Sequence, residues 1–455
     1  MAPAALAALA ACHHAKASTE GDKITESFGN PKTLAGPGEH TVLIRDGGFD
    51  LNNHVFQGKI GGAYHVHCED APAEETATDA IQAREQLIKS LQTKDTSCHL
   101  LEGLDLVRSS KFDEIEGSRD LWNERISSRG TVVDVPLSSE IPVVLEGEET
   151  FDYHGTYVAS VIAYQNPHVK LVLIADEAIE RADYTPSCPS QQDLDLTLSL
   201  FEDADVKSAY ISAPSDSLTD EISARTREHG VTLSNESFGS LSVAGMNHFC
   251  PGLDWKSFYQ VTGDLQNARA EALAQRGEFG GISVLTLRAA GNEGVTIDSV
   301  SDSLSCALGP DSLGTSSATL MVGSYNPANQ TPSAFSDRGA CVQVAAPGED
   351  IVLAAPHNFL FIASGTSFAA PLTTRLASLT FAPGTAPAEM KSKLLDLRAD
   401  NLSIPASAFP SELYYKAPGD GAPQVKLGLA SISSPLARRP QSASVRDLQR
   451  RFLPR

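Results

Sequence analysis

Four side chains that together could perform acyl transfer stand in separate glycine-flanked stretches of the sequence. Asp46 lies in "LIRDGGFD", His154 in "DYHGTYVA", Asn292 in "RAAGNEG" and Ser367 in "SGTSFAAP". A serine hydroxyl is a weak nucleophile, and it needs a histidine to take its proton and a carboxylate to orient that histidine. A side-chain amide can donate a hydrogen bond to the oxyanion that forms during the reaction. These residue types therefore predict nucleophilic catalysis by Ser367.

Each of these residues also has a simpler explanation when it is taken alone. Asp46 and Asn292 could be turn residues beside glycine, and a single histidine is more often a hydrogen-bonded core residue. The chain also contains two competitors: Asp134 in "TVVDVP" lacks following glycines, and Ser316 in "LGTSSATLMVGSY" precedes a run typical of a strand. We favour Asp46 and Ser367, because glycines follow the first and a small-residue helix follows the second.

The predicted chemistry requires elements that bring these side chains together. Aliphatic and β-branched runs predict buried strands within 41–44, 169–177, 231–240, 283–294, 318–326, 342–350 and 359–367. Helical spacing predicts helices at 79–93, 154–165, 195–204, 264–278, 368–381 and 387–399. Alternating strands and helices favour a parallel α/β sheet, where functional groups gather at the carboxyl ends of strands.

The order and setting of the four motifs resemble those of the subtilisin-like serine proteases, the subtilase family. The order Asp, His, Ser separates this family from chymotrypsin and from the α/β-hydrolases. The stretches "NESFGS", "AFSDRG" and "VAAPGEDI" are similar to further family segments, and the resemblance covers roughly residues 41–399. It implies a three-layer α/β sandwich with a central, mostly parallel sheet. It also implies a serine endopeptidase that hydrolyses peptide bonds through an acyl-enzyme.

The resemblance assigns a role to each matching residue. Ser367 would attack the scissile carbonyl, and its place at a helix start favours the developing negative charge. His154 would act as general base and then as general acid to the leaving amine. Asp46 would hold His154 in the required tautomer, and Asn292 would donate to the oxyanion.

The resemblance further implies that Ser237, Phe238 and Gly239 bind the substrate backbone as an added strand. The sequence cannot give the cleavage specificity, since the pocket residues lie in loops that the pattern does not place.

The chain departs from the family pattern at three positions near these motifs. Tyr157 replaces a usual histidine, Ser160 replaces a usual glycine, and Arg45 stands where an apolar residue is usual. An arginine at position 45 could pair with a neighbouring acid or compete for Asp46.

Three alternative hypotheses about the function compete with a serine endopeptidase. A catalytically inactive subtilase fold that binds peptides is the main alternative, and the presence of all four chemical residues disfavours it. A Ser-Glu-Asp peptidase is disfavoured by the His-Gly-Thr motif and Asn292. A GxSxG esterase is disfavoured because the chain has no such motif.

Composition and charge limit the partners of the chain. Its 455 residues are 41% hydrophobic and 20% charged, which is typical of globular proteins. The net charge of -22 argues against nucleic acid as the main partner. We expect a protein or peptide substrate and a monomer. The chemistry requires no cofactor, the "HVHC" stretch lacks a second half with metal spacing, and no ligand set for a structural calcium can be traced.

The chain is predicted to divide into a leader at 1–39, a peptidase domain at 40–405 and a C-terminal extension at 406–455. The peptidase domain would carry an insertion at about 61–150, and the extension ends in an arginine-rich tail. The leader segment "LAAC" resembles a lipoprotein signal, which would lipidate Cys12 and place the protein in the cell envelope or outside the cell. An uncleaved leader or a misplaced start is the alternative. No internal run approaches the roughly 20 apolar residues of a membrane span.

The leader is too short for the folding propeptide that the resemblance implies for secreted members. We therefore expect that the protein folds without one or that the start is truncated.

The chain has seven cysteines, and six remain when Cys12 is set aside. An even number permits three disulfides, as in exported proteins. Pairing sequence neighbours, which closes the shortest loops, gives 68–98, 188–250 and 306–341. This is one of several connectivities, and six reduced cysteines in a cytosolic protein are the alternative.

Overall fold

The structure is a computed structural model that describes most of the chain between residues 39 and 396. The described residues are 13–14, 39–68, 80–102, 144–145, 153–164, 166–176, 188–239, 241–276, 282–307, 318–326, 331–349, 351–355 and 359–396.

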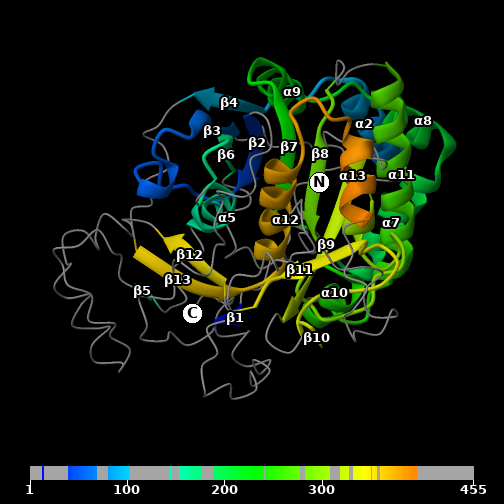
Figure 1. Cartoon of the computed structure of the whole chain (residues 1–455). Coiled ribbons are helices and arrows are strands. Elements are labelled where there is room, and N and C mark those ends of the chain that lie inside the picture. Colours follow the sequence, from blue (N-terminus) through cyan, green and yellow to red (C-terminus); the bar gives the residue numbers. More distant parts are fainter. Residues whose placement is uncertain are drawn as a thin grey trace, which may run out of the picture.

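A nine-stranded sheet forms the centre of the described molecule (Figure 1). Its strands run in the order β10-β9-β8-β7-β2-β6-β3-β4, and β11 lies beside β9. All of these neighbours are parallel except β3–β4 and β9–β10. The strands are β2 His40–Asp46, β3 Ile60–Cys68, β4 Cys98–Glu102, β6 Val169–Asp176, β7 Val231–Glu236, β8 Leu285–Ala289, β9 Thr319–Asn326, β10 Thr331–Pro332 and β11 Val344–Pro347. The predicted mostly parallel sheet is confirmed.

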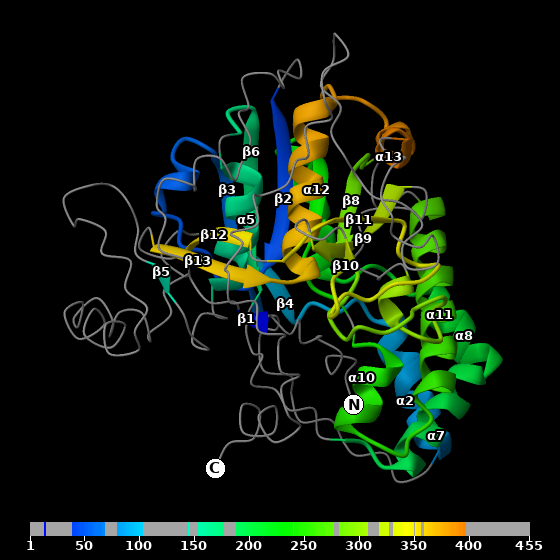
Figure 2. The same ribbon diagram turned by 60° about the horizontal axis from the view of Figure 1, so that its bottom comes forward.

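Helices cover both faces of this sheet, as expected for strands that are apolar on both sides. On one face α5 (His154–Ala163) packs beside α12 (Thr366–Thr380), and α13 (Pro387–Asp396) contacts β8 and contributes to the same core. Figure 2 shows the same helices from another side. On the other face α9 (Ser217–Glu228) contributes Ile222 to a core with β2, β3, β6 and β7. The remaining helices are α2 Ala80–Gln92, α7 Gln191–Glu202, α8 Ala204–Ser212, α10 Val243–Phe249 and α11 Trp255–Arg276, with short 3-10 helices η4 His54–Phe56 and η6 Leu304–Cys306.

A second, smaller sheet leads into α12. Its antiparallel strands β12 (Ile351–Ala355) and β13 (Phe359–Ser364) are joined by the short strands β1 (His13–His14) and β5 (Val144–Leu145), both beside β13. Strand β13 ends at Ser364 and α12 begins at Thr366, so this sheet fixes the entry of the chain into the helix that carries Ser367.

The predicted strands and helices all occur, with differences at their ends. Helix α11 begins at Trp255, well before the predicted start, because its first turns pack Trp255 and Tyr259 against α10 in an apolar cluster. Two strands, β3 and β4, fall within the segment that we predicted as an insertion, and they extend the main sheet beyond β6.

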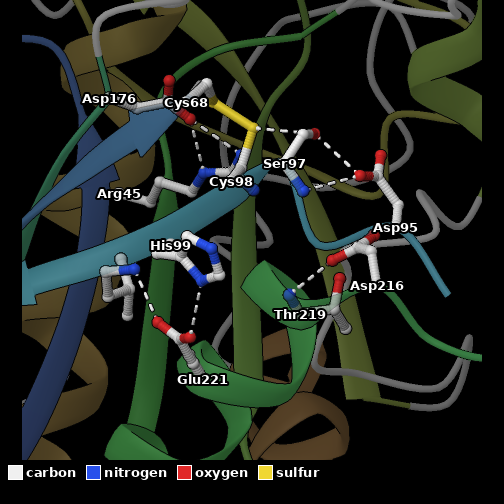
Figure 3. Close-up of a disulfide and its surroundings, with 11 residues drawn as sticks. Arg45, Cys68, Asp95, Ser97, Cys98, His99, Asp176, Asp216, Thr219 and Glu221 are labelled. Carbon is white, nitrogen blue, oxygen red and sulfur yellow. Dashed lines mark hydrogen bonds and ion pairs between the residues drawn. A yellow bond between two sulfur atoms is a disulfide. The ribbon is translucent and has the colours of Figure 1, made fainter. Parts of the chain in front are cut away.

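Three disulfides join sequence neighbours, which confirms the shortest-loop pairing. They are Cys68–Cys98, Cys188–Cys250 and Cys306–Cys341. Figure 3 shows the first of them, which links β3 to β4.

Several predictions lie outside the described residues. Among them are Cys12, Asp134, Ser316 and the arginine-rich tail, and the division into domains also stays a prediction. Within the described part, no helix is both long and apolar enough to cross a membrane. The same part contains no group of three or more His, Cys, Asp or Glu side chains that could hold a metal ion.

Candidate active site

The predicted catalytic residues meet at one edge of the main sheet. Asp46 ends β2, Ser237 directly follows β7, and Asn292 follows β8 by three residues. These strands are parallel, so their carboxyl ends lie at the same edge. His154 is the first residue of α5, and Ser367 lies in the first turn of α12. Because α5 and α12 pack side by side on one face, both helix starts reach this edge (Figure 2).

Asp46 and His154 form a buried pair. The Nδ1 atom of His154 lies 2.7 Å from Asp46 Oδ1, and the backbone N–H of Gly47 donates to the same oxygen at 2.7 Å. Asp46 is 0% exposed and His154 is 3% exposed. A carboxylate in this position holds Nδ1 in its protonated form, which leaves Nε2 as the basic nitrogen.

The glycines of the two motifs explain how this pair is held. A Cβ atom on Gly155 would lie 2.6 Å from the ring of Phe49 and 2.8 Å from the carbonyl oxygen of Gly47. The backbone N–H of Thr156 donates to Gly48 O at 3.1 Å. The start of α5 therefore lies directly on the turn after β2, and only a glycine after His154 permits this approach.

Ser367 and Ser237 are joined by two reciprocal hydrogen bonds. The Ser367 hydroxyl donates to Ser237 O at 3.0 Å, and the Ser237 hydroxyl donates to Ser367 O at 2.8 Å. Pro371 stands four residues after Ser367 inside α12 and has no N–H, so the Ser367 carbonyl lacks its usual helical donor. The Ser237 hydroxyl fills that place, which explains the spacing of the stretch "SGTSFAAP".

Asn292 lies against the start of α12 with its amide in a fixed orientation. Its Oδ1 accepts hydrogen bonds from Thr366 N and from Thr366 Oγ1, both at 2.9 Å. These two donors identify Oδ1 as the oxygen, so the amide nitrogen Nδ2 must point away from them. Nδ2 is buried and has no hydrogen-bond partner among the described residues. A buried donor of this kind can hydrogen-bond to a water molecule or to a bound group.

The predicted substrate strand lies beside these groups. Ser237 is buried, while Phe238 and Gly239 are half-buried and follow the end of β7. A Cβ atom on Gly239 would lie 2.7 Å from Ser305 Oγ, so this position also depends on glycine.

The departures from the family pattern leave the pair of Asp46 and His154 intact. Arg45 points to the neighbouring strand β6 and forms an ion pair with Asp176 at 2.7 Å (Figure 3). The Ser160 hydroxyl donates to Tyr157 O and accepts a hydrogen bond from Ala354 N, so Ser160 ties α5 to β12. Of the two expectations from the sequence, the pairing of Arg45 with a neighbouring acid is therefore confirmed.

The carboxyl groups of Glu293 and Asp337, which the sequence analysis did not identify, lie next to the turn that contains Asn292. Asp337 Oδ1 accepts from the backbone N–H of Glu293 at 3.2 Å and of Val295 at 3.0 Å. Burial raises the pKa of both carboxyl groups, and the charge of Glu293 adds to the rise at Asp337, whose pKa reaches about 9. Glu293 stands in "GNEG" and Asp337 in "AFSDRG", but nothing in the sequence indicates that the two side chains lie close together.

Comparison with known families gives a match over most of the chain. A family model described as the subtilase family matches residues 40–407. A subtilisin-like protease of Coccidioides posadasii is 30% identical over 29% of this chain and 31% of its own length. Subtilisin-like protease 4 of Arthroderma benhamiae is 31% identical over 20% of this chain and 23% of its own length. The chain thus matches less than a third of the length of these relatives.

Among solved structures, a cold adapted subtilisin-like serine proteinase has a TM-score of 0.39 and 16% identity, and the match covers 84% of this chain and 90% of that chain. A lanthipeptide protease has a TM-score of 0.42 and 14% identity, covering 88% of this chain and 96% of that chain. At these low values the structural likenesses carry no argument about activity.

Proposed function

The chain belongs to the subtilase family, and from this premise we propose that it is a serine endopeptidase with the triad Asp46, His154 and Ser367. The observation that carries the proposal is the buried contact of 2.7 Å between His154 Nδ1 and Asp46 Oδ1 at the sheet edge where Ser367 also lies. A buried histidine with a carboxylate on Nδ1 is the arrangement that a general base requires.

Catalysis would begin with a rotation of the Ser367 side chain. Its hydroxyl donates to Ser237 O in this structure, and it must turn to His154 Nε2 to be activated. His154 then takes the proton as Ser367 Oγ attacks the scissile carbonyl carbon. The proton passes to the leaving amine, the C–N bond breaks and the acyl-enzyme forms. Water, activated by His154 in the same way, releases the second product.

Two groups would stabilise the oxyanion of the tetrahedral intermediate. The Nδ2 atom of Asn292 is a buried donor that has no partner among the described residues, and the start of α12 supplies backbone N–H groups and a favourable dipole. The residues Ser237, Phe238 and Gly239 would pair with the substrate backbone as an added strand.

We also propose a protein or peptide substrate, no cofactor in the chemistry and an exported location. The three disulfides support export, because such bonds persist in oxidising compartments. Attachment through a lipidated Cys12 and the monomeric state stay predictions.

The test is cleavage of an unfolded protein substrate, with the products identified by mass spectrometry. Wild type should release internal fragments with new termini, and Ser367→Ala should release none. Products shortened only from their ends would contradict the endopeptidase. Peptide binding without cleavage by well-folded wild type would favour the inactive binding module.

A further inference from the structure

A pair of carboxyl groups lies directly behind the candidate oxyanion donor and takes no part in the mechanism above. Glu293 follows Asn292 in the turn after β8, and Asp337 lies in a segment that folds over the same turn. The two segments are joined by backbone hydrogen bonds, from Asp337 N to Gly291 O at 3.1 Å and from Gly294 N to Phe335 O at 2.7 Å. A change in the distance between the two carboxyl groups would therefore shift the backbone of Asn292.

The two carboxyl groups face the same space beside Gly291, and the charge of Glu293 favours the protonated form of Asp337, so one proton between them relieves their repulsion. Asp337 is 1% exposed, and its Oδ2 meets no N–H or hydroxyl donor among the described residues. The Glu293 carboxyl accepts from the backbone N–H of Ser242 at 3.3 Å, and the backbone N–H of Glu293 donates to Asp337 Oδ1 at 3.2 Å. Asp337 is thus tied to the backbone on both sides of Asn292, through its own N–H to Gly291 O and through its Oδ1 to the N–H of Glu293.

Gly291 provides the space in which the carboxyl groups meet. A Cβ atom at this position would lie 2.5 Å from Asp337 Oδ2 and 3.3 Å from Glu293 Oε2. The backbone of Gly291 has a φ of 116°, which side-chain-bearing residues rarely adopt. The turn therefore leaves room for two acids to meet, of which Asp337 is buried and Glu293 is half-buried.

The charged and titratable neighbours offer no compensation for a second negative charge. Across the pair, α11 presents Tyr259, whose pKa is raised by burial and further by the charge of Glu293. On β8, Arg288 is paired with Glu236 at 2.7 Å. Among the described residues, neither Arg288 nor Arg338 forms an ion pair with Glu293 or Asp337. Two ionised carboxylates here would repel each other in a poorly solvated space.

We propose that Glu293 and Asp337 share a proton that positions Asn292, so that loss of this proton at alkaline pH weakens oxyanion stabilisation. This inference rests on the proposed function. The proton leaves Asp337 for solvent, and the two carboxylates that remain push apart. Asp337 holds the backbone of Gly291 and of Glu293 on either side of Asn292, so this movement shifts the turn and takes the Asn292 amide away from the oxyanion. Because the donor acts on the transition state, kcat should fall while KM changes little.

The test compares pH profiles of kcat and KM from about pH 6 to about pH 10. The variants are Asp337→Asn and Glu293→Gln, with Glu271→Gln, an exposed acid on α11, as the control. An asparagine at 337 keeps Oδ1 as acceptor and places an N–H donor where the acid proton was. A glutamine at 293 likewise leaves one negative charge in the pair.

Wild type and the Glu271 variant should lose kcat by about tenfold per pH unit above the apparent pKa of the pair. Both amide variants should lack this alkaline loss. A wild-type kcat that stays level to the end of the range would overturn the proposal. So would an alkaline loss that persists unchanged in Asp337→Asn.

A second measurement is independent of activity. A carboxyl whose pKa is raised from 3.8 to about 9 in the folded state makes stability fall as pH rises through that window, since the unfolded chain has already released the proton. The melting temperature of Asp337→Asn minus that of wild type should therefore grow from acidic pH to about pH 9. A difference that does not change with pH would contradict the shared proton. This result holds even if the chain cleaves no substrate, so failure of the proposed function would remain distinguishable.

Discussion

Two equally buried aspartates flank the candidate site, and they face opposite partners. Asp46 is 0% exposed and faces the imidazole ring of His154, whereas Asp337 is 1% exposed and faces the carboxyl group of Glu293. Each lies beside a glycine that brings its partner close. Burial penalises charge at both positions, so the partner decides what each aspartate can do. An imidazole that gains a proton during catalysis suits a carboxylate that orients a base, whereas an acidic partner suits a shared proton.

The strongest test of this contrast is the same substitution at both positions. Asp46→Asn should lower kcat by roughly 10⁴-fold, because an amide donor favours the wrong histidine tautomer. Asp337→Asn should instead change the shape of the pH profile. The measurement is kcat over the pH range for both variants, with folding checked by circular dichroism. Similar losses at every pH in the two variants would remove the distinction.

Removal of the oxyanion donor should have the next largest effect. Asn292→Ala should lower kcat by about 10²–10³, the loss known for a subtilisin that lacks such an asparagine. The variant should also lose the alkaline dependence of the remaining activity, since the shared proton acts through this amide. Steady-state kinetics at neutral and alkaline pH measure both effects. A residual activity that still falls at alkaline pH would place the action of the acid pair elsewhere.

A smaller effect on activity is expected from a substitution that disturbs only the contact between α5 and the turn after Asp46. Gly155→Ala would force a methyl group against Phe49 and Gly47, and overpacking of this kind costs about 1–3 kcal/mol of folding stability. Activity should fall because α5 and its histidine shift, while the alkaline limb should stay. The control is Gly61→Ala in β3, where the added atom meets ordinary contacts of 3.6 Å and 3.7 Å. Chemical denaturation measures the stability of both variants, and equal losses would argue against the proposed close approach.

The sequence predicted the central fold because the core strands are aliphatic runs of readable length. It missed α9, whose buried positions are Thr219, Ile222, Ser223 and Thr226. Three of these four are polar, so no hydrophobic period marks the helix. It also did not place β3, since "IGGAYHVHC" combines glycines and histidines and enters the sheet through pairing with β6.

The candidate site was predictable where chemistry and local motif coincide. Asp46, His154, Asn292 and Ser367 each stand in a recognisable stretch, and the structure brings their elements to one edge. The pairing of Glu293 with Asp337 spans 44 residues and depends on how two turns meet, which no local pattern records. The reciprocal bonds of Ser367 with Ser237 span 130 residues and were hidden for the same reason.

The most direct test of the triad is labelling of the purified protein with a fluorophosphonate probe. Mass spectrometry should locate the adduct on Ser367. The label should be absent from Ser367→Ala and strongly reduced in Asp46→Asn. An adduct on another serine, or no adduct on well-folded wild type, would contradict Asp46, His154 and Ser367 as an assembled catalytic triad.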